Sequence, residues 1–226
     1  MLYDENIQRD FEPAILRYIY RFRKLLSWNN RKRLNEKIKF VLGDAKFTII
    51  SNNCLAGVFY HDAGRQFTSP TVNLAFDGEE FVRFCENMDH YLFESSFQFK
   101  ESGYAPYPVA NLDDIEIRFV HYKTNAECVE SWDKRKLRID WEHLFVVATD
   151  VDGLNREDLL ERFDKLKFKN KIMFTSKKLP QYKWAVTVPQ FTGRFQVRIM
   201  TQIANCKGQR YYETCFDIPK WIRENN

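Results

Sequence analysis

Short runs of β-branched and aromatic residues alternate with longer helix-like stretches along most of this chain, and this alternation limits its fold more than any other feature. The clearest strand-like runs lie at 46–51, 71–76, 114–121, 143–148 and 171–174. Between most of them, apolar residues recur three and four positions apart, as on one face of a helix. Strands that alternate with helices are typical of a sheet with helices packed on its faces.

The C-terminal part follows another pattern, because its strand-like runs are not separated by long helical stretches. These runs lie at 184–188, 195–201 and 211–216. Strands without a long crossover between them favour antiparallel pairing. We therefore expect an α/β fold with a mixed sheet flanked by helices. No Gly- or Ser-rich linker interrupts residues 44–226, so we expect one α/β domain there.

Residues 1–43 differ from the rest in charge. Residues 1–39 hold ten Lys or Arg and five Asp or Glu, whereas the remainder holds 25 and 26. Apolar residues between 15 and 26 recur at helical spacing, and a second helical stretch at 31–41 ends before Gly43. We expect a basic amphipathic helical hairpin at 1–43. It either packs on the domain with a solvated basic face or makes peripheral contact with an anionic membrane.

The cysteine pattern and the hydropathy pattern indicate the compartment. The chain has five cysteines, an odd number, with no CxxC pair. This favours free thiols in a reducing compartment over a disulfide framework or a zinc cluster. No run approaches the roughly 20 apolar residues of a membrane span, and the first residues do not resemble a signal peptide. We expect a cytoplasmic protein, placed at the inner face of the membrane if the arm binds lipid.

The first candidate site follows the strand at 46–51, because ligands of open α/β sheets bind beyond the carboxyl ends of strands. Cys54 there would begin a helix, and a helix N-terminus lowers the pKa of a thiol. In this hypothesis Cys54 is the nucleophile and His61 or His121 is the base. The substrate-binding residues would include Ser51, Asn52, Asn53 and Ser69. The alternative is that Cys54 is a small buried apolar residue.

The second candidate is the Asp150-Val151-Asp152-Gly153 segment after the strand at 143–148. Two carboxylates at the end of a strand can hold Mn²⁺ or Mg²⁺, and the cation in turn holds phosphates. This pattern occurs in metal-dependent glycosyltransferases that use nucleotide sugars. Asp and Gly are also common turn formers, so an ordinary turn is the alternative interpretation.

The third candidate is a basic helix face with Lys134 and Arg135, which could bind a substrate phosphate or could simply be solvated. No nucleic-acid-binding motif accompanies it, and residues 40–226 are almost neutral, so we expect no nucleic-acid partner. The sequence also has no GxGxxG, Walker or GxSxG motif.

Three separated stretches of the chain resemble a known family. They read FTIISNNCLAGVFYHDAGRQFTSPTVNLAF, YPVANLDDIEIRFVHYKTNAECVESWDKRKLRIDW and DLLERFDKLKFKNKIMFTSK. Together they resemble a bacterial family catalogued as domain of unknown function 1919 (DUF1919), whose members are often labelled exopolysaccharide biosynthesis proteins. The resemblance covers roughly 46–178, its continuation to residue 226 is left open, and the arm lies outside it. Where family members have Trp-Gly-Gly after the cysteine, this chain has Leu55-Ala56-Gly57.

The resemblance implies a three-layer α/β fold and a role in making surface polysaccharide or capsule, but no catalytic residue. Three functions stay open. The first is a transferase that moves an acyl group, for example from acyl-CoA, onto a polysaccharide precursor. The second is a glycosyltransferase that uses Mn²⁺ or Mg²⁺. The third is a non-catalytic binding or assembly protein of the same pathway. In each case the partner is a carbohydrate or a lipid-linked sugar precursor.

Overall fold

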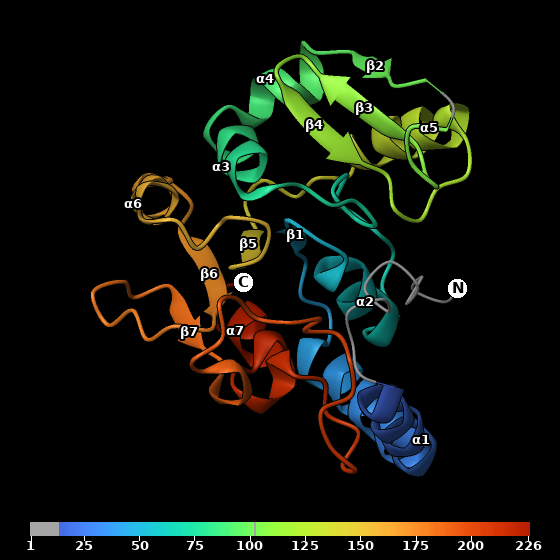
Figure 1. Cartoon of the computed structure of the whole chain (residues 1–226), viewed down its shortest axis with the longest axis vertical. Helices are drawn as coiled ribbons and strands as arrows, with labels where there is room; N and C mark the ends of the chain where they lie inside the picture. The colour runs from blue at the N-terminus through green and yellow to red at the C-terminus, as the bar shows by residue number, and fades with distance from the viewer. Residues whose placement is uncertain (1–13, 102) are drawn as a thin grey trace.

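The computed structural model describes residues 14–101 and 103–226, and its centre is a parallel sheet (Figure 1). Four strands pair in the order β1-β5-β6-β7, and every neighbouring pair is parallel. Their bounds are Thr48–Ile50 for β1, Leu144–Thr149 for β5, Asn170–Thr175 for β6 and Ala185–Thr187 for β7. The expected α/β class is therefore confirmed.

A second sheet lies beyond one face of the first (Figure 1). It is antiparallel and contains β2 (Phe97–Phe99), β3 (Val109–Leu112) and β4 (Ile115–Arg118) in that order. A two-residue turn joins β3 to β4, and Asp113 adopts a positive φ of 54° there, which short polar residues tolerate best after glycine. Parallel and antiparallel strands thus occupy two separate sheets instead of one mixed sheet.

The parallel sheet separates two hydrophobic cores, because successive side chains of a strand point to opposite faces. Along β5, Val146 and Ala148 enter one core, while Phe145 and Val147 enter the other. The first core also receives the antiparallel sheet and four helices, α3 (Gly78–Glu86), α4 (Met88–Phe93), α5 (Asn125–Lys136) and α6 (Glu157–Lys165). The second receives α1 (Ala14–Leu42), α2 (Leu55–Asp62) and α7 (Ile218–Glu224). This layering agrees with the expected helix-flanked architecture.

The described part of the N-terminal arm is one continuous helix, α1. The expectation of a helical hairpin is therefore wrong for this part. Residues 1–13 of the arm lie outside the described residues. The Asn29-Asn30 pair does not form a turn. Instead, the Asn30 amide donates to the Cys206 carbonyl at 2.9 Å, and Ile38 and Leu42 enter the second core. The helix therefore continues through this polar stretch and makes contacts with the C-terminal segment.

Three expected strands are absent from the described residues. The segment 71–76 is a chain of turns whose Ala75 forms a single bridge to Arg118. The segment 195–201 is irregular, and 211–216 contains the short 3₁₀ helix η3 (Tyr212–Thr214). Another 3₁₀ helix, η2 (Pro189–Phe191), follows β7. Side chains replace neighbouring strands as partners here; for example, Asp150 accepts from the Val197 N–H at 2.7 Å.

Helix boundaries follow local chemistry in part. Thr124 caps α5 by accepting from the Glu127 N–H at 3.2 Å, as its capping-box sequence predicts. Asp77 precedes α3 with Glu80 three residues later, which also resembles a capping box, but the Asp77 side chain makes no cap hydrogen bond. Asn87, where φ is −128°, separates α3 from α4. Gly78 is required at the start of α3 because a Cβ there would overlap the backbone of Leu154.

A search of the described helices found none whose length and hydropathy would let it cross a bilayer.

Candidate functional site

The asparagines after β1 hold the carboxyl edge of the parallel sheet together. The Asn52 amide donates to the Thr149 carbonyl at 3.0 Å and accepts from the Thr149 N–H at 3.1 Å. Asn53 donates to Thr149 Oγ1 at 2.6 Å and accepts from the Leu55 N–H at 3.0 Å. Both side chains therefore join the loop after β1 to the end of β5.

Cys54 lies at the start of α2, but its thiol is buried. The residue is 6% exposed, and its Sγ lies 4.0 Å from the Leu74 carbonyl oxygen. Burial raises the pKa of this thiol to about 12 because desolvation disfavours the thiolate. This environment matches the alternative interpretation, in which Cys54 is an inert core residue.

The two histidines offered as bases occupy different elements. His61 lies on α2 with its ring exposed, and its Nδ1 is 3.6 Å from an oxygen of Asp62. On a straight helix, its distance from Cys54 corresponds to about two turns, or roughly 10.8 Å of rise. His121 lies in the turn that follows β4. The Cys54–His61 spacing does not bring a base to the thiol.

The two acids after β5 have separate roles and do not form a pair. Asp150 is 2% exposed and accepts three hydrogen bonds, from Ser176 N at 2.7 Å, Ser176 Oγ at 2.8 Å and Val197 N at 2.7 Å. Desolvation raises the pKa of the Asp150 carboxyl. Asp152 lies 3.5 Å from Arg118, which also pairs with Asp77 at 2.5 Å. Within residues 14–101 and 103–226, no cluster of three or more His, Cys, Asp or Glu forms a potential metal site.

The remaining predicted substrate-binding residues make internal contacts. Ser51 is fully buried, and the Ser69 hydroxyl lies 3.0 Å from Thr71 Oγ1. Lys134 pairs with Glu130 on the same helix at 2.5 Å. Arg135 donates to the Val72 carbonyl at 3.1 Å. The Ser51 hydroxyl is buried without a hydrogen-bond partner among the described residues, whereas the other polar side chains of this group make hydrogen bonds or ion pairs within the protein.

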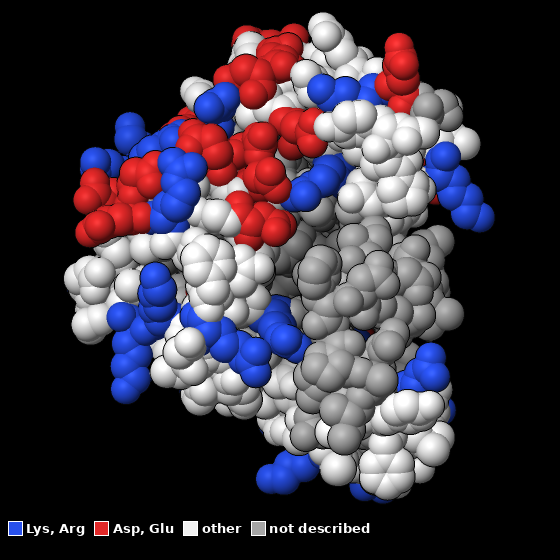
Figure 2. Space-filling view, in the orientation of Figure 1, with Lys and Arg blue, Asp and Glu red and all other residues white. Residues whose placement is uncertain are grey.

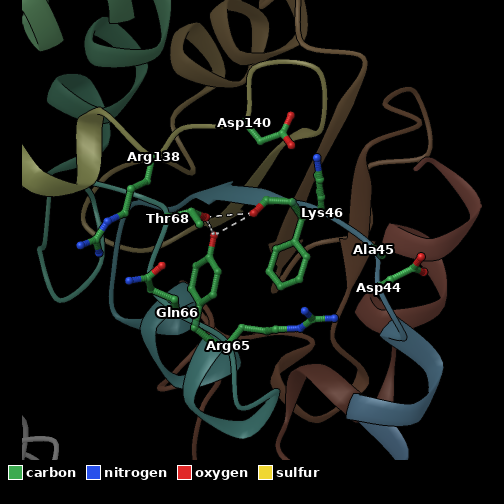
Figure 3. A pocket seen from close by; sticks show the side chains of 10 residues that line it. Asp44, Ala45, Lys46, Arg65, Gln66, Thr68, Arg138 and Asp140 are labelled. Carbon is green, nitrogen blue, oxygen red and sulfur yellow. Dashed lines mark hydrogen bonds between the residues drawn. The ribbon is translucent and has the colours of Figure 1, made fainter.

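A pocket of about 310 Å³ lies away from the carboxyl edge of the parallel sheet, beside the amino end of β1 (Figure 3). Its aromatic part is formed by Phe47 and Tyr60, whose rings stack with centroids 5.2 Å apart. The Tyr60 hydroxyl shares a 2.7 Å hydrogen bond with Thr68 and accepts from the Ile49 N–H at 3.0 Å. The complete lining consists of Asp44, Ala45, Lys46, Phe47, Tyr60, Arg65, Gln66, Thr68, Arg138 and Asp140.

Three cations line the pocket, and they come from separate segments of the chain. Lys46 precedes β1, Arg65 follows α2 and Arg138 follows α5. In Figure 3, Arg138 and Gln66 lie on the left of the pocket, Arg65 lies below it and Lys46 lies on its right. Across the described residues, neither Lys46, Arg65 nor Arg138 has an ion pair, although Arg65 donates to the Gly43 carbonyl and Arg138 to that of Phe67.

The two acids of the pocket already have partners. Asp44 pairs with Arg223 at 2.9 Å, and this hydrogen bond lowers the pKa of the Asp44 carboxyl. Asp140 Oδ1 lies 3.0 Å from His143 Nδ1 and accepts from the His143 N–H at 3.1 Å. The lining therefore contains more positive than negative charge, and its cations are available to an anionic ligand.

Sequence reasoning did not assign this pocket to a site. Arg138 ends the basic run that begins at Lys134, but Lys134 and Arg135 are the only residues of this run that we name as candidate phosphate-binding residues. Lys46 and Arg65 stand outside any motif. The only local signal was an unbalanced positive charge near strand and helix ends, and that signal is common on protein surfaces.

Comparison with known proteins identifies the family. The family described as domain of unknown function (DUF1919) matches residues 26–223. The chain is also similar to an uncharacterised protein of Haemophilus influenzae, with 35% identity over 205 residues, covering 89% of this chain and 97% of the relative. The family match extends beyond the expected 46–178 on both sides and includes the second half of α1, which we had expected to lie outside it. The chain belongs to the DUF1919 family.

Proposed function

We propose that this protein binds an anionic saccharide precursor, carrying phosphate or carboxylate, in the pocket beside β1. Within the exopolysaccharide pathway it would serve as a binding or assembly protein. The observation that carries the proposal is the set of three cations, Lys46, Arg65 and Arg138, none of which forms an ion pair among the described residues. Arg65 also acts on an acid at longer range, because its charge helps to lower the pKa of Asp44. Guanidinium groups match the geometry of phosphate and carboxylate oxygens. The saccharide part of the proposal rests on the resemblance to proteins labelled for exopolysaccharide biosynthesis.

Other groups of the pocket suit sugar hydroxyls. Gln66 provides an exposed amide, whereas the Thr68 hydroxyl is already used within the protein, where it donates to the Phe47 carbonyl at 2.9 Å and shares a hydrogen bond with Tyr60. Asp140 uses Oδ1 for His143, and Oδ2 takes part in neither of those bonds. Carboxylates accept hydrogen bonds from hydroxyls, and amides both donate and accept. A ligand with one anionic group and neighbouring hydroxyls would therefore find hydroxyl partners in the Gln66 amide and Asp140 Oδ2.

We favour binding over acyl transfer because the Cys54 thiol is buried and its pKa is raised to about 12. We also favour binding over metal-dependent glycosyl transfer, because Asp150 uses both carboxylate oxygens within the protein. The lipid-linked precursor that we expect as a partner would present its phosphate to the same cations.

Calorimetric titration with inorganic phosphate, glucose 1-phosphate and glucose tests the proposal. We expect glucose 1-phosphate to bind more tightly than glucose. Arg65→Gln and Arg138→Gln should each weaken that binding by about tenfold or more, because a hydrogen bond to a charged group contributes about 1.5–3 kcal/mol. The matched control is Lys134→Gln, which removes an exposed cation that pairs with Glu130.

The proposal is contradicted if the double variant Arg65→Gln/Arg138→Gln binds glucose 1-phosphate as tightly as the unmodified protein. Equal affinity for glucose and glucose 1-phosphate would also contradict it. Thermal unfolding of each variant checks that a lost signal reflects binding, because both arginines also donate to backbone carbonyls.

A further inference from the structure

The N-terminal half of α1 presents a row of large apolar side chains to the solvent. Tyr18, Phe22, Leu25 and Leu26 are 72%, 62%, 76% and 52% exposed. Residues spaced by three and four positions share one face of a helix. These four residues therefore form one exposed apolar face, which we call the outer face of α1.

The outer face points away from the side of α1 that packs on the protein. Ser27, Arg31, Ile38 and Leu42 are buried and follow the opposite side of the helix. Phe22 and Arg31 are nine residues apart, which is two and a half turns at about 3.6 residues per turn. Packing of α1 on the rest of residues 14–101 and 103–226 thus leaves the outer face exposed.

The charge around this face is positive. Residues 14–33 contain seven Lys or Arg and no Asp or Glu. Arg21 is exposed on this half of the helix, and the Lys32 ammonium lies 5.4 Å from the centre of the half-exposed Trp28 ring. In Figure 2 the coloured residues at the lower edge, where Figure 1 places α1, are basic or uncharged. An apolar face that is bordered by cations, with no acid among residues 14–33, complements an anionic lipid surface.

We propose that the outer face of α1 binds the surface of an anionic phospholipid membrane. The helix lies parallel to the membrane, with Tyr18, Phe22, Leu25 and Leu26 at the boundary between headgroups and acyl chains. The cations beside them contact lipid phosphates, and the buried side of the helix keeps its contacts with the body. Binding needs both the apolar side chains and the cations. Burial of the apolar side chains supplies affinity, and the positive charge supplies selectivity for anionic lipid.

Vesicle sedimentation of the full chain tests this proposal. We expect binding to vesicles of phosphatidylglycerol and phosphatidylcholine, and at least tenfold weaker binding to phosphatidylcholine alone. The triple variant Phe22→Ser/Leu25→Ser/Leu26→Ser should lose at least tenfold in partitioning. Its matched control is Leu137→Ser/Phe195→Ser, which removes apolar side chains that are 79% and 73% exposed elsewhere. The control should bind like the unmodified protein.

A second variant tests the charges separately. Arg21→Glu/Lys32→Glu should abolish the preference for anionic vesicles, and about 1 M salt should weaken binding of the unmodified protein by screening. Equal vesicle binding by the triple variant and its control would overturn the proposal. So would a dimer of the unmodified protein in gel filtration that the triple variant converts to monomer, because the face would then join two copies. The Arg65→Gln/Arg138→Gln protein should bind vesicles normally, which separates this test from that of the pocket.

Discussion

Arg31 on α1 and Glu213 near the C-terminus form a two-pronged ion pair, with N–O distances of 2.5 and 2.8 Å. Arg31 also donates to the Gly208 carbonyl at 3.0 Å, and its side chain is 8% exposed. A charge at this depth is stable only with its partners present. This pair therefore ties the basic helix to the last segment of the chain.

We predict that Arg31→Met destabilises the protein by about 3 kcal/mol or more, because breaking a buried pair leaves the other charge uncompensated. The double variant Arg31→Met/Glu213→Met should lose less unfolding free energy than Arg31→Met alone, since it removes both charges of this pair. Urea unfolding of the two variants measures the difference. A double variant that is less stable than the single variant would contradict this account.

The burial of Cys54 predicts a dependence of stability on alkaline pH. Its pKa rises from an ordinary value of 9.0 to about 12 in the folded protein. Between these values the unfolded chain has lost the thiol proton while the folded chain keeps it. The contribution of Cys54 to stability is therefore fully present below pH 9 and is lost as the pH rises toward 12.

We expect iodoacetamide to label Cys206, which is exposed, rapidly in the native protein at pH 8, and to label Cys54 only after unfolding. Mass spectrometry of the labelled peptides gives the two rates. Labelling of Cys54 at a rate close to that of Cys206 would show that the thiol is accessible, and the acyl-transfer hypothesis would regain its nucleophile.

The two acids after β5 should respond differently to substitution. Asp150→Asn should destabilise the protein by about 2 kcal/mol, because an amide nitrogen cannot accept the bonds from Ser176 or Val197, and bonds to a charged group contribute about 1.5–3 kcal/mol. Asp152→Asn should have a much smaller effect, because its ion pair with Arg118 is long and partly exposed. If urea unfolding shows that the two variants lose equal amounts of unfolding free energy, these separate roles are contradicted.

Local sequence patterns were reliable where one short segment contains all the information needed. The alternating or continuous apolar runs predicted β4, β5 and β6, and the capping box at Thr124 predicted the start of α5. Local patterns failed where apolar residues are buried without strand pairing. Val72, Leu74 and Phe76 fill the two cores from a segment of turns, and periodicity cannot distinguish this from a strand.

The sequence by itself determined the α/β class, the basic character of α1 and the family resemblance, because each depends on residue types and spacings along the chain. Tertiary structure decided which reactive and charged side chains are buried, which partners they have and which of them lie together. It buried Cys54, directed Asp150 toward Ser176 and Val197, and brought Lys46, Arg65 and Arg138 to one pocket. The physical reason is that a side chain's exposure and partners depend on segments far away in the chain. Spacing within one segment does not contain that information.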